Sequence, residues 1–202
     1  MRLINYLTVL LFVIAGCTNG QRMDDSDRFS TEAFDDDRSK AIATLHSLGD
    51  QDISGSVTFE ETDDGVSVQG SFEGLEDGEH GFHVHQFGDC SASDGSSAGG
   101  HFAPDDNEHG APDDDNRHMG DMGNLSATSG QAATINYVDE VIDIRQIIGR
   151  AVVIHGGQDD LVSQPSGDAG NRIACGVIGI AETDEESTDE AEADTVSSDI
   201  QM

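Results

Sequence analysis

The chain has 202 residues, enough for one domain of ordinary size with extensions. Its formal net charge is −32 and Lys40 is its only lysine, which argues against charge-driven binding to nucleic acid or to an anionic membrane surface. Such acidity is typical of proteins that stay soluble in concentrated salt, so we expect a halophilic source, although acidic ends explain part of the excess.

The first 16 residues have the proportions of a secretory signal peptide. Arg2 precedes an apolar run from Leu3 to Ala15 that is too short to span a bilayer comfortably. The run ends in Ile-Ala-Gly-Cys17, which resembles the lipobox of bacterial lipoproteins, where the cysteine is acylated after cleavage. We therefore expect an exported protein, periplasmic or at the cell surface, that touches the membrane only through lipid on Cys17. An ordinary signal peptide is the alternative.

Two segments lack the apolar pattern of a folded domain. Residues 17–39 comprise the lipidated cysteine and an acidic tether, which is rich in Asp, Ser and Arg without a sustained period. Residues 183–202 form an acidic tail that we expect to be disordered. The folded domain is thus predicted to occupy residues 40–182.

Short runs of alternating apolar and polar residues fill this domain, separated by turn clusters such as Asp63-Asp64-Gly65. No pattern of an amphipathic helix of three turns is present within it, which favours an all-β antiparallel sandwich or barrel. The predicted strand residues are Ile42, Thr44 and His46, then Val57 and Phe59, Val66 and Val68, and the runs 133–137, 141–144, 147–154 and 173–181.

Most of the histidines fall between His80 and Asp121. His83 and His85 are two apart, so in an extended strand they point to the same face. Three histidines with one carboxylate make a closed tetrahedral set that suits zinc, whereas an all-imidazole set with an open position suits copper. The sequence therefore predicts two metals, with candidate ligands His83, His85, His101, His109, His118, Asp121 and the later His155.

Two histidines fall outside these ligand sets. His80 is expected to be a packed, hydrogen-bonded residue near the site, and His46 a surface residue of a strand.

Two cysteines remain once Cys17 is assigned to the lipid. Cys90 and Cys175 lie far apart in an exported domain, which favours a disulfide. The competing interpretation is a pair of thiolate ligands for a soft metal, but neither cysteine has a Cys-x-x-Cys spacing.

From Lys40 to about Glu182 the chain resembles the copper/zinc superoxide dismutases. The resemblance implies a Greek-key β-sandwich or barrel of about eight strands with long metal-binding and electrostatic loops. It rests on the segments GFHVHQFGD (81–89), SAGGHFAP (97–104), HGAP (109–112), RHMGDMGNL (117–125), IGRAVVIH (148–155) and GDAGNRIACGVI (167–178).

Carried over residue by residue, the resemblance implies that copper is bound by His83, His85, His101 and His155, and zinc by His101, His109, His118 and Asp121. His101 would bridge the two metals. Arg172 would hold an anion beside copper, and Asp159 would link a copper ligand to a zinc ligand. Cys90 and Cys175 match the disulfide of the family.

The implied reaction is dismutation of superoxide to oxygen and hydrogen peroxide by alternating reduction and oxidation of copper, with zinc structural. In the family's mechanism the bridging imidazole, here that of His101, also delivers a proton. One departure is the lack of a lysine between His155 and Arg172, where many members have one that draws in superoxide. The alternatives weighed are a non-enzymatic copper/zinc-binding surface lipoprotein and an adhesive sandwich domain.

The resemblance also extends to segments that pair in the dimers of eukaryotic members. These are Phe87-Gly88, Ile148-Gly149 and the run from Gly176 to Ile180. They predict a possible homodimer.

Overall fold

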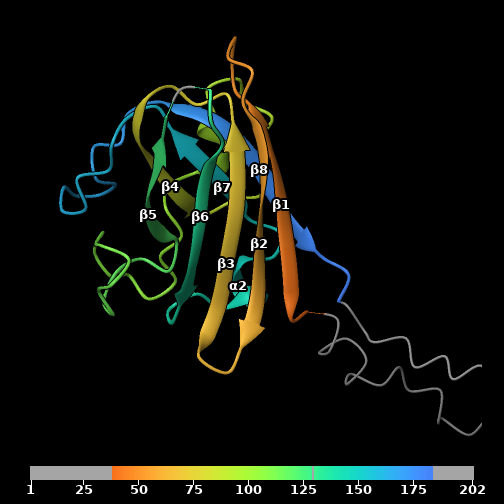
Figure 1. The fold of residues 1–202 in the computed structure, drawn as a ribbon. Helices are drawn as coiled ribbons and strands as arrows, with labels where there is room; N and C mark the ends of the chain where they lie inside the picture. Colours follow the sequence, from red (N-terminus) through yellow and green to blue (C-terminus); the bar gives the residue numbers. More distant parts are fainter. Residues whose placement is uncertain (1–37, 129, 184–202) are drawn as a thin grey trace, which may run out of the picture. The chain divides into compact units, whose positions relative to one another are not determined.

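The computed structural model describes residues 38–128 and 130–183, and these form one antiparallel sheet of eight strands (Figure 1). The order across the sheet is β5-β4-β7-β8-β1-β2-β3-β6. The strands are β1 (Lys40–Ser47), β2 (Ser54–Thr62), β3 (Gly65–Glu73), β4 (Gly78–His85), β5 (Asp121–Ala127), β6 (Ala133–Asp139), β7 (Ala151–His155) and β8 (Arg172–Ile180).

The sheet curls into a nearly closed barrel. Its two outermost strands, β5 and β6, follow each other in the sequence, whereas β3 leads to β4 and β6 leads to β7 by connections that cross between non-neighbouring strands. This is a Greek-key arrangement, and the predicted all-β fold class is confirmed.

In β1, β2 and β3 buried side chains alternate with more exposed ones, whereas β7 is buried throughout. In β1, Ala41, Ala43 and Leu45 are fully buried, while Thr44 and His46 face outward, as expected for His46. The inward faces of the strands pack around the rings of Phe59, Phe72 and Phe82, with the last two in an edge-to-face contact at 5.4 Å between centroids. Burial of this apolar face selects the register of each strand.

One predicted strand is wrong. The run 141–144 was expected to be extended, but Ile144–Ile147 is a short helix, α2, in place of a strand. Asp143 caps it by accepting a hydrogen bond from the backbone N–H of Arg145, and Ile144 and Ile147 bury the same side. An apolar run of this length fits either a strand or a helical turn, and the capping aspartate decides here. The following strand, β7, therefore begins only at Ala151.

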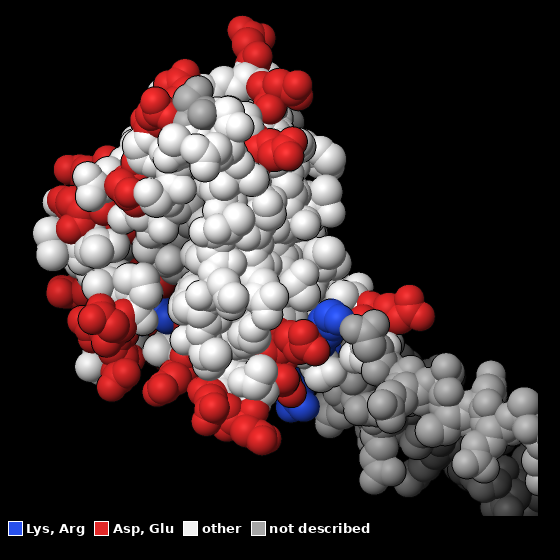
Figure 2. Space-filling view, in the orientation of Figure 1, with Lys and Arg blue, Asp and Glu red and all other residues white. Residues whose placement is uncertain are grey.

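Acidic side chains lie around the top, left and lower parts of the visible face of the domain, with few basic ones among them, while its centre is uncharged (Figure 2). The acidity is thus a property of the domain as well as of the chain's ends.

Several predictions concern residues outside the described ranges. These are the signal peptide, the lipidated Cys17, the tether up to residue 37 and the tail from residue 184. Among the described residues, no helix has the length and apolar character needed to cross a bilayer.

A second short helical turn, η1 (Ser96–Ala98), lies in the loop after β4.

Candidate metal centre

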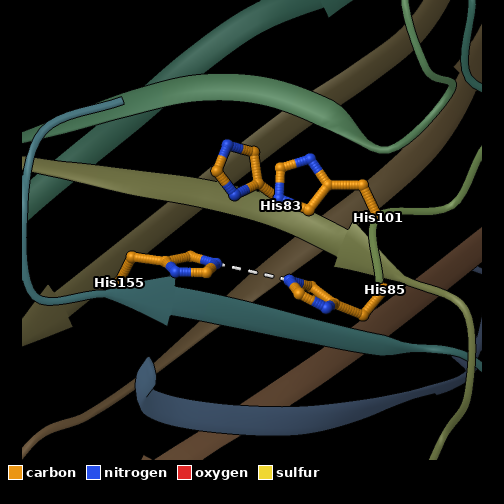
Figure 3. A group of neighbouring side chains, drawn as sticks. All are labelled: His83, His85, His101 and His155. Carbon is orange, nitrogen blue, oxygen red and sulfur yellow. Dashed lines mark hydrogen bonds between the residues drawn. The ribbon is translucent and has the colours of Figure 1, made fainter. Parts of the chain in front are cut away.

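Four predicted ligands come together at one side of the sheet (Figure 3). His83 and His85 share a face of β4, His155 ends β7, and His101 lies in the loop after η1, where its backbone bridges to His85. All four side chains are buried, and one ligand nitrogen from each lies within 4.8 Å of the others. We call these residues the four-histidine set.

Backbone hydrogen bonds fix the position of His101. The Phe102 N–H donates to the Val84 carbonyl, the Val84 N–H to the Gly120 carbonyl, and the Gly120 N–H to the Phe102 carbonyl, each at 2.9 Å. Gly120 is required here, because a Cβ at that position would collide with the Val84 carbonyl oxygen. The loop that carries His101 is thereby held between β4 and the segment that leads into β5.

His85 and His155 face each other through their Nε2 atoms, 3.3 Å apart (Figure 3). The Nδ1 of His85 lies 3.0 Å from the Gly99 carbonyl oxygen, and that of His155 lies 3.2 Å from the Gly170 carbonyl oxygen. Because a carbonyl only accepts, both Nδ1 atoms carry the proton in the neutral rings. Two Nε2 lone pairs then point at each other, which is the arrangement that a cation between them satisfies.

The other two imidazoles of the set also present a nitrogen without a partner. His83 uses Nε2 to contact Asp159, and His101 uses Nδ1 to contact Asp121. The remaining nitrogens, Nδ1 of His83 and Nε2 of His101, are buried and make no hydrogen bond. A buried polar atom without a partner is costly, so the donor set fits a metal that takes nitrogen ligands.

A second group, which we call the carboxylate set, surrounds Asp121. It consists of His101, His109, His118 and Asp121, all buried, with ligand atoms within 4.8 Å of one another. Asp121 Oδ1 lies 2.7 Å from His101 Nδ1 and 3.2 Å from His118 Nδ1. His109 Nδ1 lies 3.0 Å from Asp121 Oδ2, but off the line of a good hydrogen bond. Three nitrogens and one carboxylate oxygen fit zinc.

Asp159 connects the two sets. Its carboxylate is fully buried and contacts His83 Nε2 at 2.7 Å and His109 Nε2 at 2.9 Å. Both rings are thereby oriented with Nδ1 turned away from Asp159, toward the other members of their sets. Asp159 is itself held by Asn124, whose carboxamide pairs with the Asp159 backbone N–H at 2.8 Å and carbonyl at 2.9 Å.

Burial and charge set the protonation of these groups. Burial lowers the pKa of His85 to about 2, of His155 to about 3 and of His101 to about 4, so each is neutral near pH 7. Burial opposes charge on His109 too, but contacts with Asp121 and Asp159 raise its pKa to about 9. Although burial alone would raise the pKa of Asp121, its imidazole neighbours hold it well below the usual range.

Arg172 begins β8 and lies opposite His155 in the strand pairing. Its guanidinium donates to the carbonyl oxygens of Gly95 and Gly99, both at 2.5 Å. Asp94, Ser96 and Asn171 line the same cleft, of about 520 Å³. A fixed cation therefore lies at an open cleft beside the four-histidine set.

Cys90 and Cys175 form a disulfide, with the sulfur atoms 1.99 Å apart, so the thiolate-ligand alternative is wrong. The two cysteines are 85 residues apart, and closing a loop of that length contributes about 4.5 kcal/mol in the chain-entropy model. Such a bond persists in an oxidising compartment, outside the cell or in a periplasm. It ties the segment after His85 to β8.

His80 is buried as expected, with its ring nitrogens 2.9 Å from the His155 carbonyl oxygen and 3.0 Å from that of Glu76. Sequence reasoning missed Arg117, which is 1% exposed and makes two hydrogen bonds to Asp139 at 2.8 and 2.7 Å. It also donates to the carbonyl of His118 at 2.9 Å. Its position next to a candidate ligand was the only available signal.

Comparison with known proteins agrees with this geometry. Residues 53–178 match the family model described as copper/zinc superoxide dismutase (SODC). Superoxide dismutase [Cu-Zn] A of Xenopus laevis is 47% identical over 150 residues, which cover 69% of this chain and 97% of the relative. The crystal structure of the clock protein EA4 superposes with a TM-score of 0.63 at 44% identity, covering 71% of this chain and 96% of that one.

The chain belongs to the copper/zinc superoxide dismutase family. Its enzyme class is therefore superoxide dismutase of the copper/zinc type, and its cofactors are copper and zinc.

Proposed function

We propose that the four-histidine set binds copper and the carboxylate set binds zinc, with His101 shared between them, for the dismutation of superoxide. The observation that carries this assignment is the pair of buried nitrogens without partners, Nδ1 of His83 and Nε2 of His101, in a pocket where His85 and His155 also turn lone pairs inward. Bound copper would supply the redox step, accepting an electron from one superoxide and giving one to a second.

The protein's own groups bind and orient the substrate. Superoxide is a small anion, and Arg172 offers it a guanidinium whose direction is fixed by hydrogen bonds to Gly95 and Gly99. Reduction of superoxide to hydrogen peroxide consumes protons, and Nε2 of His101 is the buried imidazole atom that we assign to hold one of them. Asp121 keeps that ring in place through Nδ1, at 2.7 Å.

Substitution of Arg172 tests this assignment. Arg172→Ala is expected to lower the second-order rate with superoxide about 10- to 100-fold, because the fixed cation that attracts the anion is lost, while copper and zinc contents stay at wild-type values. Arg145→Ala, in α2, is the matched control and should leave both unchanged. Wild-type activity in Arg172→Ala with full metal content would refute the role of Arg172. A wild type that holds both metals but has no dismutase activity would leave a metal-binding protein as the better description.

For the amino-terminal region we propose export and lipid attachment at Cys17. The support is the apolar run after Arg2 and the Ile-Ala-Gly-Cys17 pattern. Expression of the full chain in a bacterium with a radiolabelled fatty acid should label the wild type. Cys17→Ser should abolish the label and release the domain from membranes, and labelling that persists in this variant would rule out Cys17.

We also propose a homodimer formed through an apolar patch. Phe87, Val177 and Ile180 are 58%, 46% and 48% exposed, large values for such side chains. Gly149 adjoins the strand that carries Val177 and Ile180, since its N–H donates to the Ile178 carbonyl at 2.8 Å. Phe87→Glu is expected to convert a dimer into a monomer in sedimentation velocity, while a wild-type monomer at micromolar concentration would refute the proposal.

A further inference from the structure

Gln164 lies in the loop between β7 and β8, 55 residues from His109, yet its side chain pairs with the backbone of that histidine. Its Oε1 accepts from the His109 N–H at 2.9 Å, and its Nε2 donates to the His109 carbonyl at 2.9 Å. One carboxamide thus satisfies both backbone polar groups of a single residue, as a neighbouring strand would.

The same loop also holds the imidazole of His109. Asp159 contacts its Nε2 at 2.9 Å, and Gly167 packs so closely that a Cβ there would overlap Asp159 Oδ1. His109 is therefore held at two points by one loop, at its ring by Asp159 and at its backbone by Gln164. Contact at the ring alone leaves the ring free to tilt about that point, whereas the second contact fixes the backbone from which the ring extends.

The other member of this contact, Asp159, is held by a similar pair of hydrogen bonds. Asn124 pairs with the backbone N–H and carbonyl of Asp159 in the same way, at 2.8 and 2.9 Å. Both members of the Asp159–His109 contact are thus held by a carboxamide clamp, one from β5 and one from the loop. Neither clamp touches a candidate metal position, so both act through the residues that they hold.

We propose that Gln164 is a positioning residue for the carboxylate set, which keeps Nδ1 of His109 directed at the cation that the set binds. The inference rests on the proposed zinc site. Gln164 is itself exposed, so its truncation removes little apolar contact, and the cost to the metal-free fold comes from the two backbone groups of His109 that lose a partner. Its effect should appear where the geometry of His109 matters, in how firmly the cation is held.

Zinc release from the full, metal-loaded protein tests this. With a chromophoric chelator in excess, Gln164→Ala is expected to release zinc about 10-fold faster than wild type, the lower end of the range for residues that hold metal ligands. The matched control is Gln158→Ala in the same loop, since the Gln158 side chain is exposed and makes no hydrogen bond within the described part of the chain. Equal release rates for the two variants would overturn the proposal.

A spectroscopic measurement separates positioning from a general loss of stability. Cobalt(II) in place of zinc reports the ligand geometry in its visible absorption, and Gln164→Ala is expected to change that spectrum while Gln158→Ala keeps the wild-type bands. A lower melting temperature of the metal-free Gln164→Ala protein with an unchanged cobalt spectrum would mean a structural role only. If wild type takes up no cobalt or zinc at His109 and Asp121, the proposed metal site fails, and the clamp has no cation to act on.

Discussion

The four-histidine set and the carboxylate set share His101 but differ in what surrounds them. In the first, each ring turns one nitrogen to a protein acceptor, and burial keeps the imidazoles neutral, with the pKa of His85 lowered to about 2. In the second, Asp121 and Asp159 flank His109 and raise its pKa to about 9. The first set therefore presents free lone pairs to a metal, whereas the second holds a proton that a metal must displace.

The two sets are also anchored differently. The loop after His85 is joined covalently to β8 by the Cys90–Cys175 disulfide. The segment before Asp121 is held by the buried ion pair of Arg117 with Asp139, and Arg117 reaches the His118 carbonyl as well. A covalent bond thus anchors the side with the Arg172 cleft, and a buried ion pair anchors the side of the carboxylate set.

Removing the shared residue should have the largest effect. His101→Ala takes a ligand from both sets, so activity is expected to fall more than about 100-fold, beyond the range for residues that only support ligands, with loss of both metals. Asp121→Asn removes a ligand from the carboxylate set alone, although it also weakens a contact with His101, and should lose zinc while copper is retained. Metal content after dialysis and dismutase activity measure both variants. Retention of both metals in His101→Ala would show that the sets are independent.

The buried ion pair comes next. Asp139→Asn leaves the guanidinium of Arg117 buried without its counter-charge, which is expected to cost about 3–5 kcal/mol in the free energy of unfolding. Urea denaturation of the metal-free protein measures this loss. Asp143→Asn, at the cap of α2, is the control and should cost no more than about 1 kcal/mol. If Asp139→Asn also cost no more than about 1 kcal/mol, the ion pair would not anchor the segment before Asp121.

The barrel and the ligand pattern could be predicted because they follow from local rules. Alternation in β1 reports which side faces the core, and two histidines spaced by one residue share a face in any strand. In contrast, β5 was not predicted as a strand, since Met122-Gly123-Asn124 shows no alternation of apolar and polar residues. Its place in the sheet is set by its pairing with β4, which only the folded chain reveals.

Contacts between distant segments could not be predicted for the same reason. Nothing near Gln164 in the sequence indicates that its carboxamide meets the backbone of His109, 55 residues away. Arg117 sits beside a candidate ligand, but its partner Asp139 is 22 residues further on and is one of many acidic residues. Such pairs depend on tertiary packing, and a single sequence carries no signal that selects one partner among many.

Proton release distinguishes the two sets directly. The pKa of His109 is raised, so its protonated form stabilises the metal-free protein fully below about pH 6.5, and this contribution is lost as the pH rises through about 9. Zinc alone, bound by the metal-free protein near pH 7.5, should therefore release about one proton more than copper alone, because His101 keeps one ring proton when only one metal is bound. Calorimetry in two buffers of different ionisation enthalpy measures the difference, which should fall by half at about pH 9 and vanish at higher pH. Equal release for both metals at pH 7.5 would remove the contrast between the sets.

The smallest expected effect concerns the entrance to the four-histidine set. Asp94 lines the cleft with Arg172, and the loop before Arg172 has no lysine to offset it. An exposed carboxylate there repels superoxide only while salt does not screen it. Asp94→Asn is expected to raise the rate about 2-fold at 10 mM ionic strength and to leave it unchanged near 1 M, since exposed charge interactions are weak and screened.

Pulse radiolysis across an ionic-strength series measures this effect. Asp63→Asn removes the same charge in the exposed turn between β2 and β3, at the opposite end of these strands from Arg172, and should alter the rate less. Because the surrounding charge is strongly negative, the wild-type rate should also fall little with added salt, or rise. A steep fall in the wild type would mean that the field of Arg172 outweighs the acidic surface at the entrance. Equal effects of Asp94→Asn and Asp63→Asn would assign the repulsion to the net charge rather than to Asp94.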